Sequence, residues 1–188
     1  IYETVYLNDT PVAVIKQTRT GNPNTQPPTL NVTTEVFNVY ADHIDTPRVI
    51  TKATDQSIVW SWITAEPFGA TLPNSNPNNL GTFVFNQRFP GQVYDAETNL
   101  NQNWHREYQA LSGNYLTTDP LGLEGGSLSL YAYAERQPTR FVDPSGLSSF
   151  AASGLAGGVT FPDTGGMSFP ANPGAALAGL RSLGAAGA

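Results

Sequence analysis

The chain contains no cysteine, so neither a disulfide framework nor a thiolate metal site is available to it. Charge is also scarce, with nine Lys and Arg against fifteen Asp and Glu and a formal net charge of −6. The few basic residues form no stripe, which argues against a nucleic-acid partner. No apolar run reaches the ~18 residues that a membrane-spanning helix needs. The two histidines, His43 and His105, are too far apart to match a metal-ligand spacing, and no metal or other cofactor is expected.

Turn-forming and aromatic residues are plentiful instead. The 188 residues include 18 Gly and 15 Pro, which disfavours long helices, and the aromatic share of 11% is too high for a disordered chain. Strand-like segments at 2–16, 33–42, 48–65 and 83–120 alternate with polar, Pro-rich stretches at 17–32 and 67–82, which we expect to be exposed loops. Such short units cannot bury their own faces and must stack, so the sequence predicts an all-β fold of short antiparallel strands.

The composition changes after Leu147. Residues 148–188 hold nine of the 18 glycines, ten alanines and only two charged residues, Asp163 and Arg181. A segment of this kind cannot build much of a core, so we expect an irregular Gly/Ala-rich tail. The chain begins at Ile1, without a Met or a signal-like segment, and we expect it to be a piece of a longer protein.

One pentapeptide pattern, Asp-Pro-x-Gly-Leu, occurs twice: as "DPLGL" from Asp119 and as "DPSGL" from Asp143, where the second copy ends at the composition boundary. Asp-Pro and Gly favour turns. If the sheet brings the two turns together, the aspartates form a carboxylate pair in which one member keeps a proton and the other loses it. Such a pair can activate a water and protonate the leaving nitrogen of an amide without metal, Cys or His. The nearest amide lies in the chain itself, just past Asp143.

A simpler interpretation of the repeated pattern stays open. Asp-Pro-x-Gly is an ordinary turn sequence, since Asp caps the turn, Pro presets φ and Gly adopts a positive φ. The three tryptophans also have two interpretations. Trp60, Trp62 and Trp104 suit packing between strands, and they would alternatively serve a glycan-binding β-domain as a stacking platform.

Longer ordered motifs then give a resemblance. The run 88–147 contains "RFPGQ", "YDAET", "DPLGL", "YAY" and "VDPSGL" in order, and it resembles the Rhs-associated core of Rhs/YD-repeat proteins. Upstream, "ADHIDTPRVITKATDQSIVWSWITAEPFGAT" and "YLNDTPVAVI" are similar to repeats of that family. The resemblance covers 2–147 and implies three parts: YD-repeat strands at 1–87, the core with its autoprotease motif at 88–147, and the tail at 148–188 as the start of, or linker to, a C-terminal effector.

The resemblance also implies a function. Members of the family are polymorphic toxins, secreted or delivered by a bacterial secretion system, whose repeats build a hollow β-shell around an effector. The core acts on its own chain as an aspartyl autoprotease. The matching catalytic residues here are Asp119 and Asp143, and the cut falls between Leu147 and Ser148. The chain's C-terminal segment would then be both substrate and cargo. A fragment of shell exposes open sheet edges, so we also expect oligomers.

Two positions depart from the family pattern. Many relatives carry Arg beside the first aspartate or in the turn before it, where this chain has Thr118 and Asn114. An Arg there would orient a carboxylate and lower its pKa. Arg140 is the candidate to replace that cation. The alternative function is therefore a catalytically silent structural, encapsulation or surface-interaction module.

Overall fold

The computed structural model describes residues 1–22, 24, 29–63, 66–125 and 127–151. These residues fall into two compact units that interleave along the sequence. The first unit comprises Ile1–Asp42, Pro47–Ile63 and Leu72–Phe85. The second comprises His43–Thr46, the described part of Thr64–Thr71, and the chain from Asn86 onward. The expected tail at 148–188 lies outside the described residues except for its first four positions.

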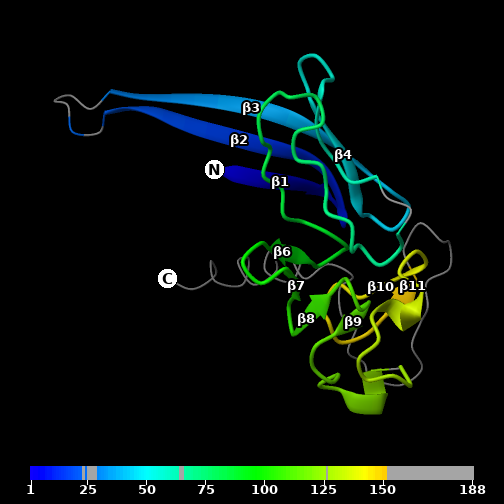
Figure 1. The fold of residues 1–188 in the computed structure, drawn as a ribbon. Coiled ribbons are helices and arrows are strands. Elements are labelled where there is room, and N and C mark those ends of the chain that lie inside the picture. The colour runs from blue at the N-terminus through cyan, green and yellow to red at the C-terminus, as the bar shows by residue number, and fades with distance from the viewer. Residues whose placement is uncertain (23, 25–28, 64–65, 126, 152–188) are drawn as a thin grey trace, which may run out of the picture. The chain divides into compact units, whose positions relative to one another are not determined.

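The first unit is a five-stranded antiparallel sheet in the order β1-β2-β3-β4-β5 (Figure 1). Its strands are β1 (Tyr2–Leu7), β2 (Thr10–Asn22), β3 (Thr29–Ala41), β4 (Pro47–Lys52) and β5 (Ile58–Ser61). Each strand pairs with the next one along the chain, so the sheet is a simple meander. The tight turn between β1 and β2 has Asn8 in the left-handed region, at φ 56°, which Asn tolerates better than most residues.

The prediction of an exposed loop at 17–32 is wrong. Most of this stretch belongs to the long β2–β3 hairpin, in which Gln17 pairs with Thr34 and Gly21 with Leu30. The stretch is polar because the hairpin is exposed there, and the sequence pattern did not distinguish an exposed ribbon from a loop. Its four Thr residues are good strand formers, and they are the signal in the sequence that favours a strand here.

The core of the first unit forms from aliphatic and aromatic residues of the sheet and from the 72–85 segment. Phe83 packs on Phe37 with ring centroids 4.7 Å apart, and Phe85 packs edge-on against Trp60 at 5.3 Å. Trp60 and Trp62 are each 1% exposed, so neither ring is available as a stacking platform for a glycan. Packing in the core accounts for both of these tryptophans.

The second unit contains a four-stranded antiparallel sheet in the order β6-β7-β8-β9, and a separate two-stranded pair, β10 and β11. The strands are β6 (Val93–Asp95), β7 (Leu100–Asn103), β8 (Arg106–Gln109), β9 (Asn114–Tyr115), β10 (Phe141–Val142) and β11 (Phe150–Ala151). Two short 3-10 turns, η1 (Gly122–Gly125) and η2 (Ala134–Arg136), lie between β9 and β10 in sequence.

The core of the second unit is an aromatic cluster. Tyr133, fully buried, has its ring centroid 4.6 Å from that of Tyr108, 5.8 Å from Tyr115 and 5.6 Å from Phe89. Tyr108 and Tyr115 stand on the neighbouring strands β8 and β9, where they pair directly. This cluster fixes the face of β8 and β9 on which the site below is built.

The predicted all-β fold of short antiparallel strands is confirmed. The regular structure of the described residues consists of antiparallel strands and the two 3-10 turns. Among these residues, no helix is long and apolar enough to cross a membrane.

Candidate active site at Asp119 and Asp143

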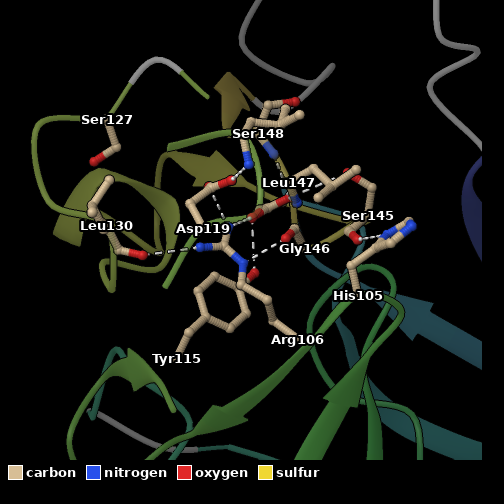
Figure 2. A network of polar contacts seen from close by, with 12 residues as sticks. His105, Arg106, Tyr115, Asp119, Ser127, Leu130, Ser145, Gly146, Leu147 and Ser148 are labelled. Carbon is tan, nitrogen blue, oxygen red and sulfur yellow. Dashed lines mark hydrogen bonds and ion pairs between the residues drawn. The ribbon is translucent and has the colours of Figure 1, made fainter. Parts of the chain in front are cut away.

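The two aspartates of the repeated pentapeptide converge on one arginine, Arg106, which was not among the predicted site residues. Arg106 Nη2 lies 3.0 Å from Asp119 Oδ2 and 3.1 Å from Asp143 Oδ2. The side chains of all three residues are at most 6% exposed. Figure 2 shows the guanidinium of Arg106 at the centre of this polar network. The two carboxylates thus form a buried pair bridged by a single cation.

Both pentapeptides form turns, as their Pro and Gly residues predict. In the first, Asp119 Oδ1 accepts the Leu121 N–H at 2.8 Å, and Gly122 stands at φ +60°. In the second, the Gly146 N–H reaches the Asp143 carbonyl at 3.4 Å, and Gly146 stands at φ +69°. The turn interpretation is therefore correct locally. The fold adds what local sequence does not encode, because it brings the two turns together.

The carboxylate of Asp143 faces the peptide bond that follows Leu147. Its Oδ1 accepts the backbone N–H of Leu147 at 3.1 Å and that of Ser148 at 3.2 Å. The nitrogen of the Leu147–Ser148 amide is therefore within hydrogen-bond distance of an aspartate.

The carboxylate of Asp119 lies beside the carbonyl of the same amide. A Cβ added to Gly125, at the end of η1, would stand 2.9 Å from Asp119 Oδ2 and 2.9 Å from the Leu147 carbonyl oxygen. Both oxygens therefore lie around the position that a Cβ of Gly125 would occupy, which places them at most 2.9 + 2.9 = 5.8 Å apart, and only glycine fits here. One aspartate thus accepts a hydrogen bond from the nitrogen of the Leu147–Ser148 bond, and the other lies near the carbonyl oxygen of the same bond, across Gly125.

The segment before this bond is held by the turn between β7 and β8. Asn103 Nδ2 donates to the Asp143 carbonyl at 2.8 Å, and His105 Nδ1 is 3.0 Å from the Ser145 carbonyl, which it reaches as a donor. Arg106 Nε donates to the Gly146 carbonyl. A Cβ at Gly146 would come 2.4 Å from the Asn103 carbonyl oxygen, so this position too accepts only glycine. Carbonyls from three residues of the "DPSGL" segment are thus bound by one turn.

Tyr115 completes the surroundings of Asp143. Its hydroxyl donates to Asp143 Oδ2 at 2.8 Å and accepts from Asn103 Nδ2 at 2.7 Å. Its ring lies under the Arg106 guanidinium, 3.7 Å from centroid to carbon, in cation–π geometry. Burial raises the pKa of the Tyr115 hydroxyl well above its ordinary value, so this group stays protonated and remains a donor.

Burial also raises the pKa of Asp143, and this effect outweighs four contacts that lower it. The lowering contacts are the Tyr115 hydroxyl, the Arg106 charge and the N–H groups of Ser148 and Leu147. Each of them stabilises the ionised carboxylate, whereas removal from water destabilises it. Asp143 consequently keeps its proton to a higher pH than a free aspartic acid does.

Neither Arg140, the candidate replacement for the family arginine, nor Thr118 and Asn114, which stand at the family arginine positions, supplies a cation to the aspartates. Arg140 is exposed, and its guanidinium stands over the ring of Phe141 at 5.3 Å. Thr118 is exposed, and Asn114 Nδ2 donates to the Ser112 carbonyl. The cation at the aspartates is Arg106 instead.

One signal in the sequence could have identified Arg106. It alternates with Tyr108 along β8, so the strand period places this charge on the buried face. A buried arginine is rare unless it is paired with acidic groups.

Comparison with known proteins identifies relatives by sequence, although no family model matches the chain. The putative uncharacterized protein YlbH of Escherichia coli (strain K12) is 46% identical over 94 residues, which are 50% of this chain and 37% of YlbH. The toxin protein Tse5 of Pseudomonas aeruginosa is 35% identical over 108 residues, 57% of this chain and 8% of the toxin. The probable deoxyribonuclease RhsB of Dickeya dadantii is 43% identical over 63 residues, 34% of this chain and 4% of RhsB. The chain thus spans about a third of YlbH and a small part of each larger protein.

A solved structure shares the fold. The crystal structure of TcdB2-TccC3-Cdc42 superposes on 78% of this chain with a TM-score of 0.53 and 19% sequence identity, over 8% of the matching chain. At this identity the match supports the fold alone.

Proposed function

The chain is a relative of the Rhs-type toxin proteins, as its motifs predicted, and from that premise we propose that it cuts its own backbone between Leu147 and Ser148. Asp119 and Asp143 are the catalytic residues of this reaction. The observation that supports the proposal most strongly is the position of the two carboxylates: Asp143 accepts the N–H of the Leu147–Ser148 amide, and Asp119 lies near the carbonyl oxygen of the same amide.

The roles of the two aspartates follow from their positions. Asp119, beside the carbonyl, takes a proton from a water as the water oxygen bonds to the Leu147 carbonyl carbon. Asp143, whose pKa is raised, gives its proton to the Ser148 nitrogen as the C–N bond breaks. The products are a carboxyl group on Leu147 and an amine on Ser148. The pair exchanges its protonation states in the process, and no metal or redox partner is needed.

Arg106 acts as a positioning residue for the pair. Because one nitrogen contacts both carboxylates, it fixes their separation and offsets the repulsion between them as charge moves from one to the other. Its Nε also holds the carbonyl of Gly146, next to the amide that is cut. The catalytic pair and the substrate backbone are therefore oriented by the same side chain.

A turn-capping role alone explains less of this arrangement. It accounts for the contacts of Asp143 Oδ1 with the Leu147 and Ser148 N–H groups. It gives no reason for a second buried carboxylate beside the same peptide bond. Removing an arginine and two carboxylates from water costs several kcal/mol per ion, which a turn does not require. Such arrangements are typical of functional sites.

We also propose the biological setting that the relatives suggest. Residues 1–87 would form a wall of YD-repeat strands, 88–147 the core that holds the autoprotease, and 148–188 the beginning of the released segment or a linker to it. The chain would thus be part of a shell that encloses an effector and is delivered by a bacterial secretion system. The edge strand β1 would pair with another shell segment or another copy, which size-exclusion chromatography tests by showing oligomers rather than a monomer.

A time course with variants of each aspartate tests the cleavage. The purified full chain is incubated from mildly acidic to neutral pH and followed by denaturing gel. We expect it to divide into two fragments, and we expect Asp119→Asn and Asp143→Asn each to remain intact. Asp95→Asn serves as the matched control, because Asp95 is an exposed turn aspartate of the same unit that binds the Glu97 N–H.

The outcomes separate the two proposed functions. Cleavage that persists in both site variants would refute the assignment of the pair. A parent chain that stays intact throughout would leave the silent shell segment as the function.

A further inference from the structure

We propose that the residues after the cut are bound as a β-strand, and that backbone pairing of β11 with β10 is part of how the site holds its substrate. This inference rests on the self-cleavage proposed above. It adds a second binding element, on the side of the leaving amine, to the contacts made by the β7–β8 turn.

The peptide bond in question lies in the connection of a β-hairpin. Asp143 follows directly on β10, and the chain returns so that Phe150 pairs with Val142 and Ala151 with Phe141. The catalytic Asp143 is therefore covalently attached to the strand that binds the leaving segment. Any shift of β11 along β10 would move the Ser148 N–H relative to the Asp143 carboxylate.

The two sides of the bond are held by different means. On the side of Leu147, side chains hold the backbone, with His105 on the Ser145 carbonyl and Arg106 on the Gly146 carbonyl. On the side of Ser148, the next regular element is β11, which pairs through main-chain groups. Because the chain is held on both sides of the Leu147–Ser148 bond, the amide stays next to the carboxylates. Positioning of this kind raises the rate of cleavage by a large factor.

Backbone pairing defines what the site recognises. Main-chain N–H and C=O groups are common to all residues except proline, so a strand site accepts many sequences and excludes proline where an N–H must be donated. The segment that pairs with β10 must therefore be extended and have no proline at positions 150 and 151. The identity of the side chains there contributes little.

Two double variants of the full chain test this. The first, Phe150→Pro with Ala151→Pro, removes both backbone N–H groups, because in an antiparallel pair only alternate residues donate to a given neighbour. The second, Phe150→Thr with Ala151→Val, changes both side chains and keeps both N–H groups in residues that favour strands. Rates of self-cleavage are measured as a function of pH by denaturing gel, and thermal unfolding checks that both variants fold like the parent.

We expect the double proline variant to cleave about ten- to a hundredfold more slowly, because the amide is no longer positioned. The shape of its pH profile should be unchanged, since pairing acts on position and not on the protons of the carboxylates. The Thr/Val variant should cleave like the parent. In the uncleaved Asp119→Asn chain, hydrogen exchange should protect β10 and β11 amides, and the two prolines should abolish that protection.

Three results would overturn the inference. A double proline variant that cleaves at the parent rate would show that pairing is not used. Equal slowing in both double variants would show that side chains carry the recognition instead. A parent chain that does not cleave at all refutes the proposed function, and the inference fails with it, whereas the first two results leave self-cleavage intact.

Discussion

Gly125→Ala is the substitution that most specifically disturbs the proposed chemistry. The added Cβ would stand 2.9 Å from Asp119 Oδ2 and 2.9 Å from the Leu147 carbonyl oxygen, closer than the 3.0 Å below which real Cβ atoms essentially never approach another atom. Neither oxygen can move away easily. The Asp119 carboxylate is held by Arg106 and by the Leu121 N–H, and the other oxygen belongs to the backbone.

The expected losses of stability and of cleavage rate follow from how far the two oxygens must move to make room for the Cβ. Ordinary van der Waals contact of a Cβ begins at 3.4 Å, so each oxygen must move by 3.4 − 2.9 = 0.5 Å. Overpacking of this kind costs about 1–3 kcal/mol of folding stability. Misplacement of a reacting group by about 1 Å costs on the order of a hundredfold in rate, so about tenfold is expected here.

The assay compares Gly125→Ala with Gly122→Ala, a glycine in the same 3-10 turn. Gly122 has φ +60° and nothing within 4 Å of an added Cβ, so its replacement strains the backbone and adds no contact to the Asp119 carboxylate or to Leu147. Self-cleavage rates are measured by gel, and stabilities by denaturant unfolding of the Asp119→Asn chain. We expect Gly122→Ala to lose about 1 kcal/mol of stability and to cleave at nearly the parent rate. Cleavage by Gly125→Ala at the parent rate would refute the placement of Asp119 beside the Leu147 carbonyl.

Two further predictions concern the neighbours of the pair. Arg106→Gln leaves Asp119 and Asp143 buried without their cation, so unfolding by denaturant should show a loss of about 3–5 kcal/mol. The partly exposed Arg48 is the control: Arg48→Gln should cost at most about 1 kcal/mol, and an equal loss in both variants would contradict the reasoning. Tyr115→Phe removes a hydrogen bond that lowers the pKa of Asp143, so this pKa rises further. Because Asp143 must be protonated to act as the acid, the high-pH limb of the pH–rate profile should move to higher pH, and a move to lower pH would reverse the assigned role.

Sequence reasoning located the candidate site but not its electrostatics. The pairing of Asp119 with Asp143 could be proposed because Pro and Gly encode each turn locally and the second turn sits at a composition boundary. Arg106 was missed because its contacts are nonlocal, since it reaches Asp143 across 37 positions. Only the pairing of β7 with β8 and the packing of "DPSGL" on their turn bring these residues together.

The fold was predictable to a similar extent. Alternating β-branched and aromatic residues predicted antiparallel strands, and these are present. The outer part of the β2–β3 hairpin, within 17–32, is polar and rich in Pro and Asn, and its described residues are mostly exposed in the structure, so its sequence resembles that of a loop. The proximity of Gly125 to the Leu147 carbonyl could not be foreseen, since a glycine in a turn usually reflects backbone conformation and not a close contact.

Intact mass spectrometry of the purified full-length chain, followed over time, tests the central claim most directly. The account predicts that the 20.1 kDa species divides into two fragments, one ending at Leu147 and the other beginning with a free amine on Ser148, and that water is the only mass added. A single 20.1 kDa species at every pH and time, or a cut at any other bond, would contradict it.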